Sequence, residues 1–301
     1  MANTVIAVLG GDKRMNFAAR ELVHLGYDVR EWGRQESDNA ASFSKLAKEW
    51  LSGVDVLLLP LPTSLDGTHL STPLCGGEEK LRMETLFLAA PNKLWLAGRL
   101  SESLQLRAER EGIQTVDYFE NEILQLKNAI PTAEGAIEIA MRELPVVLDS
   151  TKVSVIGYGR IGEVLAQKLK ALGAEVTVWA RRREVCVKAK GFGYKAEQMI
   201  GEESLLFDTD TRVIFNTVPS RIFTRAVLQT LGKECIIIDL ASAPGGVDLV
   251  AAKELGISTI WATALPGKCA PESAGIILGE TVHSILLDAR QRSDFLREDT
   301  R

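Results

Sequence analysis

The residues with the clearest chemical meaning are three glycines, Gly157, Gly159 and Gly162, in a Gly-x-Gly-x-x-Gly run. In such a run the first glycine permits a tight turn, and the second lets the backbone approach a pyrophosphate. The third lets a helix pack close to the preceding strand, and the start of that helix offers free N–H groups to the phosphates. The sequence therefore predicts a dinucleotide site made by Gly157, Tyr158, Gly159, Arg160, Ile161 and Gly162. The alternative is a Rossmann-type strand–helix–strand unit that has this fold but binds no dinucleotide.

The residues about 20 positions beyond the glycines indicate which dinucleotide would bind. An NAD site usually has Asp or Glu there to hold the ribose 2′-hydroxyl, whereas this chain has Ala180 followed by Arg181, Arg182 and Arg183. A carboxylate would repel a 2′-phosphate, whereas guanidinium groups bind it with paired hydrogen bonds. We therefore expect Ala180, Arg181 and Arg182 to select NADP(H) over NAD(H). Alternatively, these arginines only solvate the start of the next helix.

Three later loops, at 216–220, 239–246 and 264–268, are expected at the same edge, because ligands of an open parallel sheet bind beyond the carboxyl ends of its strands. Their small residues suit a backbone that passes close to a cofactor, although proline and glycine also make ordinary turns. From these loops we expect cofactor contacts by Thr217, Val218, Pro219, Leu240, Ala241 and Pro266, with Ser242 and Lys268 as candidate catalytic residues.

The first half of the chain carries a second set of polar candidates. Arg14 stands at a predicted helix start, where its guanidinium and the helix dipole both favour an anion such as a carboxylate. An exposed helix-cap arginine is the alternative. Thr63 and Asp66, in a loop facing the same way, and Thr132 are predicted to bind substrate. Glu134 is either a general base or a carboxylate that complements the dipole of a helix start.

Histidine chemistry has little support in this sequence. His24 and His283 fall in predicted helices and are expected to be structural, whereas His69 lies in a loop and has no assigned role. Neither a Ser-His-Asp set nor a metal-ligand set is indicated, so we expect no metal.

The elements that would position these residues alternate between strand and helix. Around the glycine run, Val153 to Ile156 predicts a strand, Ile161 to Leu172 a helix that stops at Gly173, and Glu175 to Trp179 a second strand. Further strands are expected at 212–216, 235–240 and 258–261.

The first 120 residues show the same alternation, which implies a parallel sheet covered by helices on both faces. Residues 121–150 are spaced for a helix with Pro131 near its start, and a last helix is expected over 272–288. The strands of the first half are predicted at 5–9, 27–32, 54–59, 93–96 and 114–118, and its helices at 14–25, 43–51, 78–88 and 101–111.

We therefore predict an α/β protein with two doubly wound parallel-sheet domains joined by linking helices. The domains are a flavodoxin- or Rossmann-like substrate domain at 1–125 and a Rossmann NADP-binding domain at 151–271. A linking helix at 126–150 joins them, and residues 272–301 form a helix that returns to the first domain.

Composition excludes several other classes of protein. A chain with 46% hydrophobic and 25% charged residues is typical of soluble globular proteins. The net charge of −5 gives no basic surface for nucleic acid or membrane. No apolar run reaches the ~20 residues of a membrane helix, and the N-terminus lacks the basic start of a signal peptide. The cysteines are widely spaced without a CxxC pair, which favours reduced thiols in the cytoplasm.

Beyond the glycine run, several longer segments resemble the A-subunit family of dipicolinate synthase from endospore-forming bacteria. These segments run almost the whole length of the chain, and the last two are the most specific. They are IAVLGGDKR at 6–14, NAIPTAEGAIEIAM at 128–141, VIGYGRIG at 155–162, IDLASAPGGVD at 238–248 and ALPGKCAPESAGIIL at 264–278. The two-domain plan is more distantly similar to that of formate/glycerate and alanine dehydrogenases.

This resemblance implies oxidation of dihydrodipicolinate to dipicolinate in the mother cell of a sporulating bacterium, together with a flavoprotein-like B subunit. Such a reaction needs groups that hold two carboxylates and a site that excludes water. Arg14 and Lys268 are the candidates for the carboxylates, Ser242 and Thr132 for orienting donors, and Glu134 for a base. Self-association into a homo-oligomer is also expected.

The chain departs from the D-2-hydroxy acid dehydrogenases at the residues that oxidise an alcohol. Those enzymes use an Arg after the fifth strand and a later His paired with a Glu. Here the comparable loop has Ala243-Pro244, and no His follows until His283. This departure disfavours a hydroxy-acid substrate and fits oxidation of a ring that has no alcohol to deprotonate.

Two hypotheses for the function remain open. In the first, this chain is the catalytic oxidoreductase subunit. In the second, it binds cofactor and substrate or serves assembly, while electrons pass through the flavin of the partner. No decisive acid–base pair in the sequence separates the two.

Overall fold

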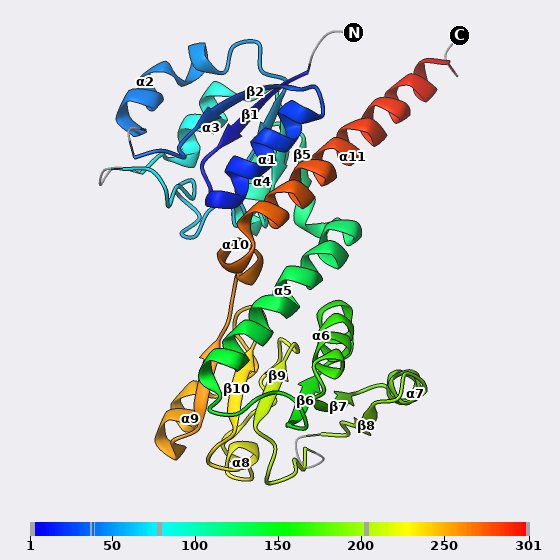
Figure 1. The fold of residues 1–301 in the computed structure, drawn as a ribbon. Helices are drawn as coiled ribbons and strands as arrows, with labels where there is room; N and C mark the ends of the chain where they lie inside the picture. The colour runs from blue at the N-terminus through cyan, green and yellow to red at the C-terminus, as the bar shows by residue number, and fades with distance from the viewer. Residues whose placement is uncertain (1–3, 37, 39, 77–79, 202–204, 299–301) are drawn as a thin grey trace. The chain divides into compact units, whose positions relative to one another are not determined.

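The structure is a computed structural model that describes residues 4–36, 38, 40–76, 80–201 and 205–298. The chain forms two compact units, which are described separately below (Figure 1). Unit 1 comprises Met1–Lys127 and Ala270–Arg301, and unit 2 comprises Asn128–Cys269. Within the described ranges, no helix combines the length and the apolarity that crossing a bilayer requires.

Unit 1 contains a five-stranded parallel sheet in the order β2-β1-β3-β4-β5, an order found in doubly wound folds. Its strands are β1 (Val5–Leu9), β2 (Asp28–Trp32), β3 (Val56–Leu58), β4 (Leu94–Ala97) and β5 (Thr115–Asp117). Its helices are α1 (Lys13–His24), α2 (Ala40–Trp50), α3 (Met83–Ala89), α4 (Glu102–Arg110) and the short 3-10 helix η1 (Tyr118–Glu120). The predicted strand–helix alternation is confirmed here.

Alternate residues of β1 explain why helices cover both faces of this sheet. Ala7 and Leu9 are buried against α2, α3 and α4, whereas Ile6 and Val8 are buried against α1 and α11 (Pro271–Glu298). A strand that is apolar at every position needs such a cover on each side.

Unit 2 contains a six-stranded parallel sheet in the order β11-β10-β9-β6-β7-β8, the Rossmann order. Its strands are β6 (Lys152–Ile156), β7 (Glu175–Ala180), β8 (Lys195–Gln198), β9 (Val213–Asn216), β10 (Ile236–Asp239) and β11 (Ser258–Trp261). Its helices are α6 (Arg160–Ala171), α7 (Arg183–Gly191), α8 (Arg225–Leu228), α9 (Leu249–Leu255) and α10 (Leu265–Cys269). The strand order reverses between β6 and β9, so the carboxyl ends of these two strands mark the ligand edge.

Several elements differ from the sequence prediction, and β8 was not among the predicted strands. The helix α5 (Glu122–Glu143) is continuous, and Pro131 lies inside it rather than near its start. Because proline has no N–H, the carbonyl of Lys127 lacks the helical hydrogen bond that residue 131 would otherwise donate. Lys127 is also the last residue of the first segment of unit 1. The expectation of a loop over Ala264 to Lys268 was wrong, because α10 occupies most of it. The last helix continues to Glu298 instead of ending near Asp288.

Helices α1 and α11 pack side by side in unit 1, and two glycines of α11 permit their close approach (Figure 1). A Cβ atom on Gly275 would lie 2.4 Å from the carbonyl oxygen of Arg14 and 2.5 Å from Cβ of Phe17. A Cβ atom on Gly279 would lie 2.8 Å from Cβ of Glu21. Any side chain at either position must therefore push the two helices apart.

We expect Gly275→Val to lower the free energy of unfolding by about 1–3 kcal/mol, because it overpacks this helix contact. Urea unfolding followed by circular dichroism measures the effect. Ser273→Val in the exposed part of the same helix is the matched control, since it adds a β-branched side chain without a steric contact. Equal midpoints for the two variants would contradict the packing argument.

Candidate functional site

The glycine run forms the turn between β6 and α6, and each of its glycines meets a different constraint. Gly157 has a φ of +90°, and a Cβ atom there would lie 2.3 Å from Oγ1 of Thr217. A Cβ atom on Gly162 would lie 2.1 Å from the carbonyl oxygen of Gly157. Both positions therefore need glycine for packing within the protein. Around Gly159 the space is open, so a ligand can approach its backbone.

The start of α6 suits a diphosphate. Gly159 is the N-cap residue and offers no side-chain hydrogen bond to the first turn of this 12-residue helix. The first N–H groups of a helix need partners, and together with the helix dipole they attract an anion. The open space at Gly159 and the uncapped helix start therefore fit the pyrophosphate of a dinucleotide, which the backbone of Gly157 to Gly162 would hold.

The residues after β7 carry the charge that the sequence predicts. Ala180 is buried at the end of the strand, whereas Arg181 and Arg182 are exposed. The backbone carbonyl of Arg181 accepts a hydrogen bond from Nε2 of Gln198 at 3.0 Å, which ties this turn to β8. The guanidinium of Arg182 lies 3.6 Å from the carboxylate of Glu184, and both side chains are largely exposed. Because an exposed ion pair contributes little energy, a phosphate can take the place of Glu184 beside Arg182.

Tyr158 packs beside this region through aromatic and cationic contacts. Its ring meets that of Tyr194 edge to face, with the centroids 6.0 Å apart, and Nζ of Lys188 lies 5.7 Å from its centroid. Burial, followed by the nearby Tyr194 and Glu163, raises the pKa of Tyr158 to about 12. The phenol therefore stays neutral at physiological pH.

The ends of β9 and β10 are joined by a buried amide–carboxylate pair that the sequence argument did not select. Nδ2 of Asn216 donates to Oδ1 of Asp239 at 2.8 Å, and both residues are almost fully buried. The carboxylate also accepts from the backbone N–H of Ala241 at 3.1 Å and of Gly246 at 2.8 Å. An acidic residue that closes the otherwise apolar run Ile236–Asp239 is the signal in the sequence that could have identified this pair.

The predicted cofactor contacts in these loops lie close to that pair. Thr217 and Val218 are half-buried after β9, Pro219 is exposed, and Leu240 and Ala241 are buried after β10. Ser242 is exposed at the edge, one residue beyond Ala241. Thus the backbone of these loops follows the ligand edge, while the side chains of Leu240 and Ala241 are buried in the unit.

Two further candidates lie on α10. Pro266 is half-buried and Lys268 is exposed on this short helix. The helix packs against α5, because a Cβ atom on Gly135 would lie 2.7 Å from Sγ of Cys269 and 3.3 Å from Cβ of Leu265. Gly135 therefore fixes the distance between α5 and α10.

The candidates on α5 are partly engaged within the protein. Oγ1 of Thr132 donates to the carbonyl of Asn128 at 2.7 Å, so only its lone pairs are left for a ligand. The carboxylate of Glu134 accepts from Nζ of Lys168 at 2.8 Å and is more than half exposed. The interpretation of Glu134 as a dipole-complementing residue at a helix start was wrong, because α5 begins at Glu122.

In unit 1, Arg14 is held firmly at the start of α1. Its guanidinium donates to both carboxylate oxygens of Asp12, at 2.8–3.1 Å, and to the carbonyl of Leu61 at 2.9 Å. The side chain is only 12% exposed, so the guanidinium is fixed in orientation at the carboxyl end of β1. A carboxylate ligand would have to share it with Asp12.

Thr63 lies at the centre of the loop after β3 and is fully buried. Its hydroxyl lies 3.1 Å from the carbonyl oxygens of Pro60 and Gly98, and it accepts from the N–H of Gly98 at 3.2 Å. These bonds tie the loop to the end of β4. Thr63 therefore acts as a structural tether within unit 1, and its substrate-binding role stays a prediction.

Asp66 organises the same loop from its exposed side. Its carboxylate accepts from the backbone N–H groups of Thr68 and His69 and from the ring of His69, each at 2.8 Å. The His69 ring, followed by the two backbone N–H groups, holds the pKa of Asp66 well below its usual range. Asp66 is thus a turn-forming residue, which leaves little of its carboxylate for a substrate.

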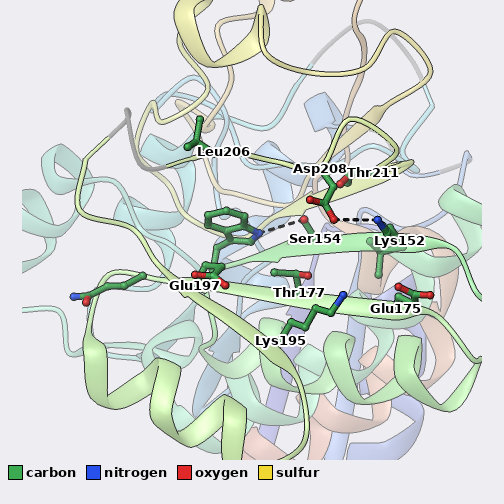
Figure 2. Close-up of a pocket in the computed structure, with 12 residues that line it drawn as sticks. Lys152, Ser154, Glu175, Thr177, Lys195, Glu197, Leu206, Asp208 and Thr211 are labelled. Carbon is green, nitrogen blue, oxygen red and sulfur yellow. Dashed lines mark hydrogen bonds and ion pairs between the residues drawn. The ribbon is translucent and has the colours of Figure 1, made fainter.

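A cavity of about 400 Å³ lies elsewhere in unit 2, on one face of β6, β7 and β8 (Figure 2). Its wall includes Ser154, Thr177 and Trp179, and Nζ of Lys152 pairs with Asp208 at 3.1 Å. None of the glycine-run residues lines this cavity. We therefore infer the candidate dinucleotide site from the start of α6 and from the strand order, not from this cavity.

Two family models match successive parts of the chain. Residues 5–119 match the N-terminal domain of the dipicolinate synthase A subunit. Residues 115–246 match the NAD binding domain of the D-isomer specific 2-hydroxyacid dehydrogenases, and this segment contains the glycine run. Unit 2 therefore carries a dehydrogenase-type NAD-binding domain.

Similar proteins agree with the first match over nearly the whole chain. The dipicolinate synthase A subunit of Bacillus subtilis strain 168 is 29% identical over 286 residues, which cover 94% of this chain and 96% of that protein. Over nearly its whole length, the chain is similar to the A subunit of dipicolinate synthase.

Solved structures from the A-subunit family share the fold. The Bacillus halodurans protein has a TM-score of 0.84 at 27% identity, with 94% of this chain and 97% of that chain covered. The Bacillus subtilis protein has a TM-score of 0.83 at 27% identity, with 97% and 98% covered. The predicted two-domain α/β fold and the predicted resemblance to the A subunit are both confirmed.

We expect Thr63→Val to lower the free energy of unfolding by about 1–3 kcal/mol, because it leaves the N–H of Gly98 without its buried acceptor. Thr68→Val, an exposed change in the same loop, is the control and should be close to neutral. Urea unfolding of both variants measures the difference. If Thr63→Val were as stable as the control, the tether assignment would fail.

Proposed function

We propose that this chain catalyses NADP-linked oxidation of dihydrodipicolinate to dipicolinate, together with the B subunit of dipicolinate synthase. The observation that carries the proposal is the uncapped start of α6, with open space at Gly159, at the carboxyl edge of a Rossmann sheet. Similarity to the A subunit of dipicolinate synthase supports the substrate, and the dehydrogenase-type domain supports hydride chemistry.

The preference for NADP over NAD rests on the end of β7. Ala180 offers no carboxylate to a ribose hydroxyl, and exposed guanidinium groups follow at Arg181 and Arg182. Two adjacent guanidinium groups bind a 2′-phosphate far better than a ribose hydroxyl.

The substrate is proposed to bind through its carboxylates and ring. In unit 2, Lys268 offers a cation to a carboxylate. In unit 1, Arg14 is a separate candidate for a carboxylate, which it would share with Asp12. Ser242 and Thr132 offer hydroxyl oxygens that orient the ring. Glu134 is a weaker candidate for the base, because it is exposed and paired with Lys168.

Oxidation of a dihydropyridine ring needs little acid–base help from the protein. A bound nicotinamide would supply the acceptor for the hydride of a ring carbon, and a ring proton would be lost to solvent or to a base as the ring becomes aromatic. No alcohol is deprotonated in this reaction. This agrees with the position of His283, whose Nδ1 lies 2.8 Å from the hydroxyl of Tyr27 within unit 1.

The alternative is a subunit that binds cofactor and substrate while the redox step occurs on a flavoprotein partner. It is favoured by the ion pair that engages Glu134, the only carboxylate among the candidate catalytic residues. The two possibilities differ in whether the isolated chain can reduce NADP⁺.

We expect the double change Arg181→Ala, Arg182→Ala to weaken NADPH binding by about 10- to 100-fold, since it removes the charges opposite the 2′-phosphate. NADH binding should stay within about threefold of wild type, because its ribose hydroxyl does not need these charges. Calorimetric titration of the full chain measures both affinities. Lys190→Ala, at the other end of α7, controls for loss of positive charge. A wild-type preference for NADH would contradict the NADP assignment.

A stopped-flow experiment tests the redox role. The purified chain is mixed with NADP⁺ and freshly generated dihydrodipicolinate, and the absorbance of the reduced nicotinamide is followed with and without the B subunit. We expect reduction by the chain alone. Tight NADP⁺ binding with reduction only after the partner is added would assign the chemistry to the partner or to the complex.

A further inference from the structure

The buried pair of Asn216 and Asp239 is the strongest feature at the ligand edge that the proposed chemistry does not use. Both residues end central strands of the Rossmann sheet, and they are 0% and 2% exposed. A carboxylate without water is costly unless hydrogen bonds stabilise it. A buried carboxylate whose hydrogen bonds are all made to the protein holds the backbone of its donors in place.

Each contact of the carboxylate is with an N–H group. Oδ1 accepts from Nδ2 of Asn216 and from the N–H of Ala241, and Oδ2 accepts from the N–H of Gly246. An ionised carboxylate only accepts, so it suits this set of donors. An asparagine in its place would turn an amide N–H₂ towards at least one donor and lose that hydrogen bond.

These hydrogen bonds span the loop from Ala241 to Gly246 and therefore fix both of its ends. Gly246 lies so close that a Cβ atom on it would be 2.1 Å from Nδ2 of Asn216. Its carbonyl accepts from the N–H groups of Ile222 and Phe223 at 3.1 and 3.0 Å. Nε1 of Trp261 adds a third tether, donating to the carbonyl of Ala241 at 2.9 Å.

The same pair extends towards the glycine run. Asn216 holds Val218 by two bonds of 3.1 Å, in which the N–H of Val218 donates to Oδ1 and Nδ2 donates to the carbonyl of Val218. Val218 and Thr217 in turn lie against Gly157, where a Cβ atom would be 3.1 Å from Cγ2 of Val218. One hydrogen-bonded and packed network therefore connects the loops after β6, β9 and β10.

The strand order assigns the halves of a dinucleotide to different parts of this edge. The strands β6, β7 and β8 form one mononucleotide-binding half of the sheet, and β9, β10 and β11 form the other. The residues after β7 would meet the adenosine ribose. The loops after β9 and β10, which the pair holds, then lie on the half that takes the nicotinamide ribose and ring.

We propose that Asp239 and Asn216 are positioning residues that hold the Ala241–Gly246 loop against the nicotinamide half of the dinucleotide. This inference rests on the proposed dinucleotide function. It predicts that damage to the pair removes the affinity contributed by the nicotinamide half and leaves the adenosine half bound as before. A residue that only stabilises the fold would affect both halves together.

Titration of the full chain with NADPH and with 2′,5′-ADP, which lacks the nicotinamide half, separates these outcomes. NADH and ADP are titrated in parallel, so that the experiment does not depend on the cofactor preference. For Asp239→Asn we expect the affinity for the reduced dinucleotide to fall by about tenfold or more, and that for the matching adenosine fragment to change by less than about twofold. The fluorescence of bound NADPH should also shift towards that of the free cofactor.

Asp248→Asn is the matched control. Asp248 lies two residues beyond Gly246 and caps α9 by accepting from the N–H of Ala251 at 3.0 Å. Asparagine is an equally good N-cap, so this variant should bind both ligands as wild type does. Circular dichroism and thermal unfolding show whether each variant is folded.

If Asp239→Asn does not fold, Trp261→Phe decides the question, because it removes the indole N–H bond to Ala241 and leaves the Asn216–Asp239 pair unchanged. It should weaken the dinucleotide by about twofold to fivefold without affecting the fragment. Unchanged dinucleotide affinity, or an equal loss for dinucleotide and fragment in a folded variant, would overturn the positioning role. A wild-type chain that binds none of the four ligands would instead overturn the proposed function itself, and the positioning role with it.

Discussion

The carboxylate of Asp239 lies inside unit 2, where burial makes a negative charge costly and three N–H groups converge on it. Because those donors come from the end of β9 and from both ends of the next loop, satisfying the charge fixes the backbone at the ligand edge. The glycines then fit around this arrangement. Gly246 and Gly157 stand where any Cβ atom would displace Asn216 or Thr217. Hydrogen bonding and steric exclusion thus specify one loop conformation together.

Unit 1 fixes the ends of its strands in the same way, with both neutral and charged groups. The hydroxyl of Thr63 joins the loop after β3 to Gly98 at the end of β4, and Asp66 closes the exposed turn of that loop. Arg14 is oriented by Asp12 and by the carbonyl of Leu61. In both units the polar side chains at the carboxyl ends of the strands are therefore fixed before any ligand binds, which lowers the entropy cost of binding.

The strands and the glycine run were predictable from the sequence, because β-branched runs such as Val153 to Ile156 and the spacing of Gly157 and Gly159 reflect local preferences. The element over Ala264 to Lys268 was not, since its proline and glycine favour a turn and only packing against α5 makes it helical. The prediction that Pro131 lies near a helix start was wrong for a related reason. Proline by itself favours a helix end, but Pro131 is buried in unit 2 and lies inside α5.

The candidate site was predictable only where a single segment makes it. The backbone of the glycine run and the arginines after β7 are local features, and the structure has them in the expected turns. The partners of Thr63 and of Asp239 are distant in the sequence, at Gly98 and Asn216, so no local pattern could reveal that these side chains are already engaged.

A crystal structure of the full chain grown with NADPH tests the central claim most directly. We expect the pyrophosphate at the start of α6, the 2′-phosphate beside Arg181 and Arg182, and the nicotinamide against the loop from Ala241 to Gly246. Cofactor density elsewhere, for example in the cavity over β6 to β8, or no density at the carboxyl edge at saturating NADPH, would contradict it.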